Sequence, residues 1–139
     1  MVIGVGIDIV TTERIKNAIA RYGDRFLNSI YCPGEIGYCN SQKYPHLHYA
    51  ARFAAKEALV KAFGTGFRFS IKHTEIETIL NELGKPDLYL HNTASAISKQ
   101  KGITHLSLSL SHNDEQATAI VIAESNPPAQ STSLWRRDL

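Results

Sequence analysis

Alternating apolar and polar residues predict strands near both ends of the chain. Residues 2–10 are rich in β-branched side chains, and their odd-numbered apolar residues would share one face of a strand. Residues 105–112 alternate leucine with serine, and residues 117–123 would form a further strand joined to them by a hairpin. Residues 67–80 and 87–91 also favour strands, with a turn between them.

Apolar residues spaced three and four apart predict helices between these strands. We expect an amphipathic helix over residues 12–22, continuing towards Leu27, and a long helix over about 47–63. A short helix over 93–101 would end at a glycine. Prolines and glycines in residues 28–46 indicate a loop with one short helical piece. The domain is therefore expected to contain both helices and strands.

The second face of the first predicted strand has an unusual composition. Gly4, Gly6 and Asp8 share it, so a carboxylate follows two positions that have no side chain. Glycine inside a strand often marks the close approach of another backbone or of a ligand. The alternative for Asp8 is that it caps the following helix or ends an edge strand.

The long helix carries charges although it is apolar around nearly its whole circumference. Such a helix is usually buried, and its charges then need partners because desolvation of an unpaired charge is costly. Glu57 and Lys61 share a narrow stripe of this helix. The simplest interpretation is a helical ion pair between residues i and i+4, worth roughly 0.3–0.5 kcal/mol.

A second interpretation joins this stripe to the first strand. Asp8 and Glu57 would provide hard oxygen ligands, which suit Mg²⁺ that completes its octahedron with water and phosphate. Lys61, one turn beyond Glu57, would reach a phosphate held on that ion. Backbone N–H groups of the following Gly64-Thr65-Gly66 turn would contact a phosphate, although an ordinary helix C-cap explains this turn equally well.

Three arginines recur at helical spacing in the first predicted helix and its extension. Arg14, Arg21 and Arg25 would align on one face with few acidic neighbours. This arginine stripe is either a solvated surface or a docking surface for an acidic helix of a partner.

Composition limits the possible function classes. The 139 residues are 43% hydrophobic and 20% charged, which predicts one globular domain, and residues 125–139 read as a poorly ordered tail. A net charge of +2 is too small to indicate general nucleic-acid binding. Cys32 and Cys39 match no zinc or redox spacing, and no apolar run approaches the roughly 20 residues that span a bilayer. We therefore expect a cytoplasmic protein with reduced thiols and no membrane association.

Four motifs carry a resemblance to one family. The segments "GVGIDIV", "RFAAKEALVKAFGTG", "GKP" and "SLSH" occur in the order and spacing of holo-acyl-carrier-protein synthases, and the similarity covers roughly residues 2–124. The resemblance implies a small α+β domain over residues 1–124, with an antiparallel sheet packed around one long helix and homotrimers that place active sites at subunit interfaces. It also implies a Mg²⁺-dependent transfer of 4′-phosphopantetheine from coenzyme A to apo acyl carrier protein, for fatty acid biosynthesis.

The resemblance also implies roles for individual residues. Asp8 and Glu57 would bind Mg²⁺, Glu57 would help to deprotonate the acceptor serine, and Lys61 would stabilise charge on the phosphate bridge. The arginine stripe would face the acidic recognition helix of the carrier protein. Positions that match the coenzyme A pocket of the family are Arg52, Gly64, Thr65, Gly66, Lys85 and Pro86.

One motif departs from the family pattern, and two other function classes stay open. The family's last motif usually reads His-x-Ser-x-Ser-His, whereas here His105 stands two residues earlier, so either His105 or Ser107 takes the place of the family histidine. A non-catalytic module that binds coenzyme A or a carrier protein would keep the fold without the transfer. An RNA-binding domain has only Phe67, Phe69 and the arginine between them in its favour.

Overall fold

The computed structural model describes residues 1–126, which form one three-stranded and one two-stranded antiparallel sheet with five α-helices and one 3₁₀ turn. In chain order the elements are β1 (Val2–Thr11), α1 (Thr12–Tyr22), α2 (Asp24–Ile30), α3 (Pro33–Asn40), α4 (Pro45–Phe63), η1 (His73–Glu75), β2 (Ile76–Leu80), β3 (Pro86–Leu90), α5 (Asn92–Gln100), β4 (His105–His112) and β5 (Gln116–Glu124).

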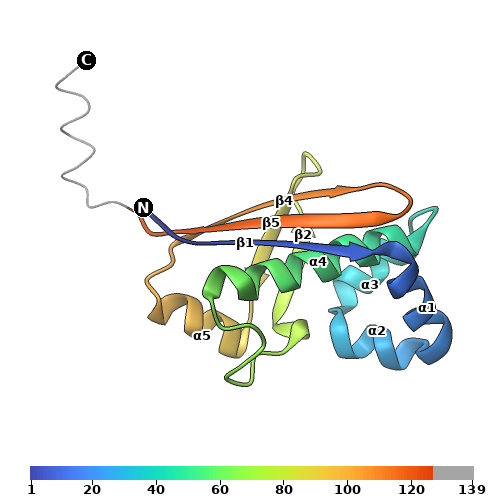
Figure 1. Ribbon diagram of the computed structural model, residues 1–139, viewed down its shortest axis with the longest axis horizontal. Coiled ribbons are helices and arrows are strands. Elements are labelled where there is room, and N and C mark those ends of the chain that lie inside the picture. The colour runs from blue at the N-terminus through green and yellow to red at the C-terminus, as the bar shows by residue number, and fades with distance from the viewer. Residues whose placement is uncertain (127–139) are drawn as a thin grey trace, which may run out of the picture.

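The larger sheet lies over the long helix α4. Its strand order is β1-β5-β4, and the smaller sheet pairs β2 with β3. Helices α1, α2 and α3 gather at one end of α4, and α5 lies near the other end (Figure 1). The inner face of β5 is buried on α4 through Ala117, Ala119, Val121 and Ala123. The core therefore lies between the three-stranded sheet and α4.

Glycines allow β1 to approach the backbone of α4 directly. A Cβ atom at Gly4 would collide with the carbonyl oxygen of Ala62, and one at Gly6 would collide with that of Ala58. The prediction that these glycines mark the close approach of another backbone is confirmed.

The close approach of β1 to α4 determines which face of the strand is buried. The glycine face packs inward, while Val5, Ile7 and Ile9 on the other face are 55%, 62% and 61% exposed. The outer face of β1 is thus an uncovered apolar surface.

Two segments differ from the sequence prediction around the helices. Residues 28–46 contain more helix than expected, because Pro33 occupies the first turn of α3, where a missing N–H group costs nothing. The helix predicted to continue past Tyr22 is interrupted at Gly23, whose φ of 56° and ψ of −135° are not helical. The first helix therefore becomes two.

The sheet prediction also needs correction. Residues 67–72 form no strand, and Phe69 and Ser70 have positive φ values of 60° and 64°, which no strand accommodates. The strands form two sheets instead of one. Most of the segment predicted to be a poorly ordered tail, from residue 127 onward, lies outside the described residues.

Candidate functional site

Asp8 and Lys61 meet where β1 crosses α4. The Lys61 ammonium donates hydrogen bonds to Asp8 Oδ1 at 2.9 Å and to the Ile7 carbonyl at 3.0 Å. Gly4 packs on Ala62 and Gly6 packs on Ala58, so a step of two residues along β1 corresponds to about one turn of α4. Asp8 therefore projects over the next turn of α4 towards the N-terminus of the helix.

Glu57 lies one helical turn before Lys61 on α4 and is half-buried. Its carboxylate Oε1 is 3.4 Å from His73 Nε2, and its side chain is 29% exposed. The expected ion pair between Glu57 and Lys61 is not found among the described residues, because Lys61 turns to Asp8 and Glu57 turns to His73. The simplest interpretation of this stripe was therefore wrong.

Asp8 and Glu57 both carry carboxylate oxygens, the type of ligand that suits a hard divalent cation. Within residues 1–126 no cluster of three or more His, Cys, Asp or Glu side chains is placed to hold a metal ion, so the candidate is a site with two carboxylates. Asp8, whose side chain is 15% exposed, already binds one positive group, the Lys61 ammonium, which is 52% exposed and can leave at little cost. Mg²⁺ accepts a few carboxylates when water and phosphate supply the other ligands.

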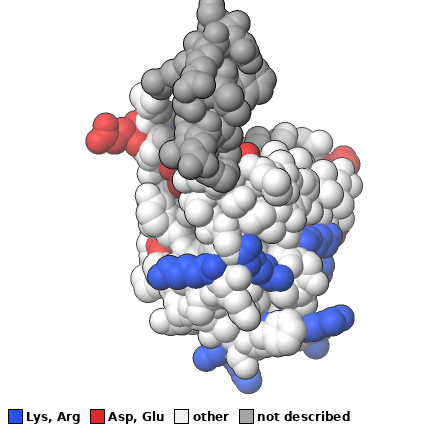
Figure 2. Space-filling view, turned by 90° about the vertical axis from the view of Figure 1, so that its left-hand side faces the viewer, with Lys and Arg blue, Asp and Glu red and all other residues white. Residues whose placement is uncertain are grey.

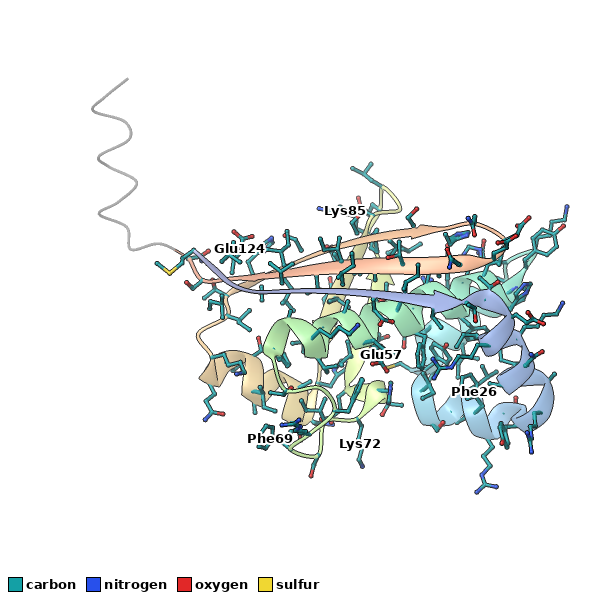
Figure 3. The ribbon with its side chains drawn as sticks, in the orientation of Figure 1. Phe26, Glu57, Phe69, Lys72, Lys85 and Glu124 are labelled. Atoms are coloured by element: carbon teal, nitrogen blue, oxygen red, sulfur yellow. The ribbon has the colours of Figure 1, made fainter. Side chains whose placement is uncertain are left out.

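Three of the residues matched to coenzyme A binding line one cavity. Arg52, Lys85 and Pro86 border a space of about 380 Å³, together with His48 and His112. Figure 3 shows Lys85 above the three strands and Glu57 below them. Burial lowers the pKa of His48 from its ordinary value, and the positive charges of His112 and Arg52 act in the same direction. The cavity therefore combines permanent cations with a histidine that resists protonation.

The glycine turn ends α4 at some distance from Arg52. Gly64 is twelve residues further along the chain, which corresponds to about 18 Å of helix. The N–H groups of Gly64, Thr65 and Gly66 donate to the carbonyls of Lys61 and Val60, so the turn is the helix C-cap considered as an alternative. Contact of these three residues with coenzyme A stays a prediction.

Thr65 borders a second cavity, of about 610 Å³, together with residues of α5. Lys101 lines this cavity, and Lys and Arg side chains predominate on the middle and lower part of this end of the molecule (Figure 2). The C-terminal end of α4 thus borders a cavity that includes one basic side chain.

His105 lies apart from both of these cavities. It is exposed at the start of β4 and borders a third cavity with Asp87, Tyr89 and Ser98. Ser107 is on the same face of β4, two residues further along. The structure does not bring His105 next to Asp8 and Glu57 within one chain, and its role stays a prediction.

The arginine stripe spans two helices. Arg14 and Arg21 are on α1, Arg25 is on α2, and all three are exposed. The Arg14 guanidinium lies 5.5 Å from the centroid of the Phe53 ring, so the stripe reaches α4 one turn before Glu57. A partner bound to the stripe would lie beside the candidate site.

The sequence prediction missed the buried partners of α4. Lys56 is 0% exposed and forms an ion pair with Glu35 at 2.8 Å, although Glu35 was placed in a loop. His73, which contacts Glu57, was read as a strand residue. The signal available in the sequence was the presence of Lys56 on a helix that is apolar nearly all round, because such a charge needs a partner.

Comparison with known proteins gives a consistent family. The 4′-phosphopantetheinyl transferase superfamily matches residues 4–121. The holo-[acyl-carrier-protein] synthase of Solibacter usitatus is 41% identical over 124 residues, covering 89% of this chain and 99% of that protein. The synthase of Carboxydothermus hydrogenoformans is 49% identical over 117 residues, covering 84% and 94%.

Solved structures of similar proteins share the fold. The crystal structure of the synthase from Neisseria meningitidis has a TM-score of 0.83 at 35% identity, covering 90% of this chain and all of that one. The synthase from Bacillus anthracis, solved in complex with CoA (3′,5′-ADP), has a TM-score of 0.75 at 33% identity and covers 91% and 99%.

Proposed function

Because the chain belongs to the 4′-phosphopantetheinyl transferase superfamily, we propose that Asp8, Glu57 and Lys61 carry out holo-acyl-carrier-protein synthesis. The chain transfers 4′-phosphopantetheine from coenzyme A to a serine of apo acyl carrier protein, for fatty acid biosynthesis. The serine oxygen forms a new bond to phosphorus, the bond to the bridging oxygen breaks, and adenosine 3′,5′-bisphosphate leaves. The observation that supports this assignment is the contact of Asp8 with Lys61 where β1 meets α4.

In this proposal Asp8 and Glu57 are the residues that would hold Mg²⁺. When bound, the ion would neutralise charge on the pyrophosphate of coenzyme A. Lys61 releases Asp8 and donates to the phosphate oxygens, where it stabilises the charge of the leaving group. Glu57 accepts the proton of the attacking serine, directly or through one water. Such a transfer depends on position and charge more than on covalent chemistry.

Coenzyme A binding is proposed to combine two parts of the surface. Arg52, Lys85 and Pro86 share one cavity, while the turn at Gly64 begins about 18 Å further along α4. A homotrimer with active sites at its interfaces would bring one group from each of two neighbouring subunits to the same coenzyme A. His105 would then contact the nucleotide or the pantetheine arm from the neighbouring subunit.

The uncovered outer face of β1 supports the trimer. Val5, Ile7 and Ile9 form a row of exposed apolar side chains, which a soluble monomer rarely leaves open. Light scattering of the purified chain should give the mass of three copies. A monomer at the concentration of the assay would exclude this part of the proposal.

The arginine stripe is proposed to bind the acidic helix of the carrier protein. Arg14→Glu should raise the KM for the carrier about tenfold and leave the KM for coenzyme A unchanged. Lys16→Glu makes the same charge reversal elsewhere on α1 and is the matched control. An equal effect on both KM values would remove the docking proposal.

We place the protein in the cytoplasm, where Cys32 and Cys39 would stay reduced; both are free thiols. Within residues 1–126, no helix is long and apolar enough to cross a membrane. Detection of the chain in an exported fraction of cells would contradict this location.

The assay that tests the activity is the intact mass of the carrier protein. Incubation with apo acyl carrier protein, coenzyme A and Mg²⁺ should add one phosphopantetheine group to the carrier. The gain should disappear with EDTA and fall strongly in Asp8→Asn. An unchanged mass over several carriers would favour the alternative, a module that binds coenzyme A or carrier protein without transfer.

A further inference from the structure

His73 is held in place on two sides by consecutive residues of α4. Lys56 donates to the carbonyl oxygen of His73 at 3.0 Å, and the carboxylate of Glu57 lies 3.4 Å from His73 Nε2. Consecutive helical residues point about 100° apart, so the 3₁₀ turn that carries His73 must lie in the angle between them. The imidazole is therefore fixed relative to Glu57 through both its backbone and its ring.

The ring of His73 is also fixed by aromatic packing. It stacks on Phe67 with ring centroids 3.8 Å apart and an interplanar angle of 19°. On α4, Phe53 lies 5.9 Å away at 18°, again as a stacked pair. An imidazole in this arrangement has few rotamers available, and its Nε2 is directed at Glu57.

The buried ion pair between Lys56 and Glu35 stabilises η1, the turn that carries His73. Lys56 is 0% exposed and also donates to Glu35 Oε1 at 2.8 Å and to the carbonyl of Ile76. Glu35 in turn accepts hydrogen bonds from the backbone N–H groups of Cys32 and Thr78. Because each of these groups is satisfied inside the protein, the position of η1 is strongly determined.

We infer that His73 is a positioning residue for Glu57. With its proton on Nε2, the imidazole donates to Glu57 Oε1, which sets the carboxylate plane and leaves the second oxygen for the divalent cation. A hydrogen-bonded partner that orients a metal-binding carboxylate typically changes metal affinity by 10–100-fold when it is lost. The inference rests on the proposed function of Glu57, and it adds His73 to the residues that the proposed function names.

Two substitutions separate the hydrogen bond from the packing. His73→Phe keeps an aromatic ring between Phe53 and Phe67 but removes the donor, while His73→Gln keeps a donor at the position of Nε2 but loses the ring. Urea unfolding of both variants shows whether the fold is retained. The readout is the dissociation constant of Mn²⁺ in the presence of coenzyme A, measured from the EPR signal of the free ion.

We expect Mn²⁺ to bind about tenfold more weakly to His73→Phe and within about threefold of the unmodified chain to His73→Gln. Raising Mg²⁺ should restore the transfer rate of His73→Phe. Wild-type Mn²⁺ binding in His73→Phe, or equal losses in both variants, would overturn the inference.

Asp8→Asn distinguishes this inference from the proposed metal site. If Asp8→Asn abolishes Mn²⁺ binding while His73→Phe changes nothing, only the role of His73 is wrong. If Asp8→Asn binds Mn²⁺ like the unmodified chain, the metal site itself is wrong and the role of His73 is excluded with it.

Discussion

Two lysines of α4 form ion pairs that differ little in length but greatly in exposure. Lys56 meets Glu35 at 2.8 Å with both side chains 0% exposed, and Lys61 meets Asp8 at 2.9 Å with 52% and 15% exposed. The first pair is enclosed and bonded to backbone groups on both sides, whereas the second is open to solvent. A buried ion pair cannot exchange partners without a large desolvation penalty. An exposed ion pair can exchange partners at a much smaller cost in free energy. We therefore propose that the Glu35 pair stabilises the fold, whereas Asp8 and Lys61 can change partners during the reaction.

The largest expected effect is on stability at the buried pair. Lys56→Met leaves the Glu35 carboxylate without its cation, and we expect the free energy of unfolding to fall by about 3–5 kcal/mol. Urea unfolding followed by circular dichroism measures this loss. The double variant Glu35→Leu with Lys56→Met should recover part of it, because no unpaired charge is then buried, although the N–H groups of Cys32 and Thr78 lose their acceptor. If the free energy of unfolding of Lys56→Met falls by less than about 1 kcal/mol, the buried pair contributes no more than an exposed one and the proposed difference is wrong.

The exposed pair should show the opposite behaviour. In Lys61→Met we expect the free energy of unfolding to change by less than about 1 kcal/mol, while the transfer rate falls about 100-fold. The rate is followed by the intact mass of the carrier protein at saturating coenzyme A. Lys16→Met, at an exposed position of α1, is the control and should leave both quantities unchanged. A stability loss as large as that of Lys56→Met would make Lys61 structural too.

The expected effect of His48 on stability is smaller and depends on pH. Burial lowers its pKa below the ordinary value of 6.5, and nearby His112 and Arg52 add to the shift. The unfolded chain therefore takes up a proton more readily than the folded protein as the pH falls below about 6.5. Folding should lose stability over that range until the folded histidine also titrates, and His48→Asn should reduce the loss. If the unfolding midpoints of the unmodified chain and of His48→Asn fall in parallel as the pH is lowered, this prediction is contradicted.

The patterns that predicted the fold correctly were local. Strict alternation placed β4 at residues 105–112, and the spacing of apolar residues placed α4 within two residues of its start. Glycine at positions 4 and 6 predicted the close packing of β1 because no other residue tolerates that contact. These features depend on neighbours in sequence or on one residue type.

The features that were missed depend on contacts between distant segments. Glu35 lies in a stretch interrupted by proline and glycine, and its partner Lys56 is 21 residues away, so no periodicity connects them. The Asp8 contact of Lys61 spans 53 residues and replaced the local pair with Glu57. His73 reads as strand sequence, and only the fold places it beside Glu57. Local sequence gave the candidate ligands, but tertiary packing decides which charges pair.

We propose that Asp8 exchanges Lys61 for a divalent cation shared with Glu57. A crystal structure with Mn²⁺ and coenzyme A, in which anomalous scattering locates the metal, tests it most directly. We predict one Mn²⁺ bonded to a carboxylate oxygen of each residue, with the Lys61 ammonium moved from Asp8 to a phosphate oxygen. A Mn²⁺ bound to coenzyme A without either carboxylate, and Lys61 still paired with Asp8, would contradict the claim.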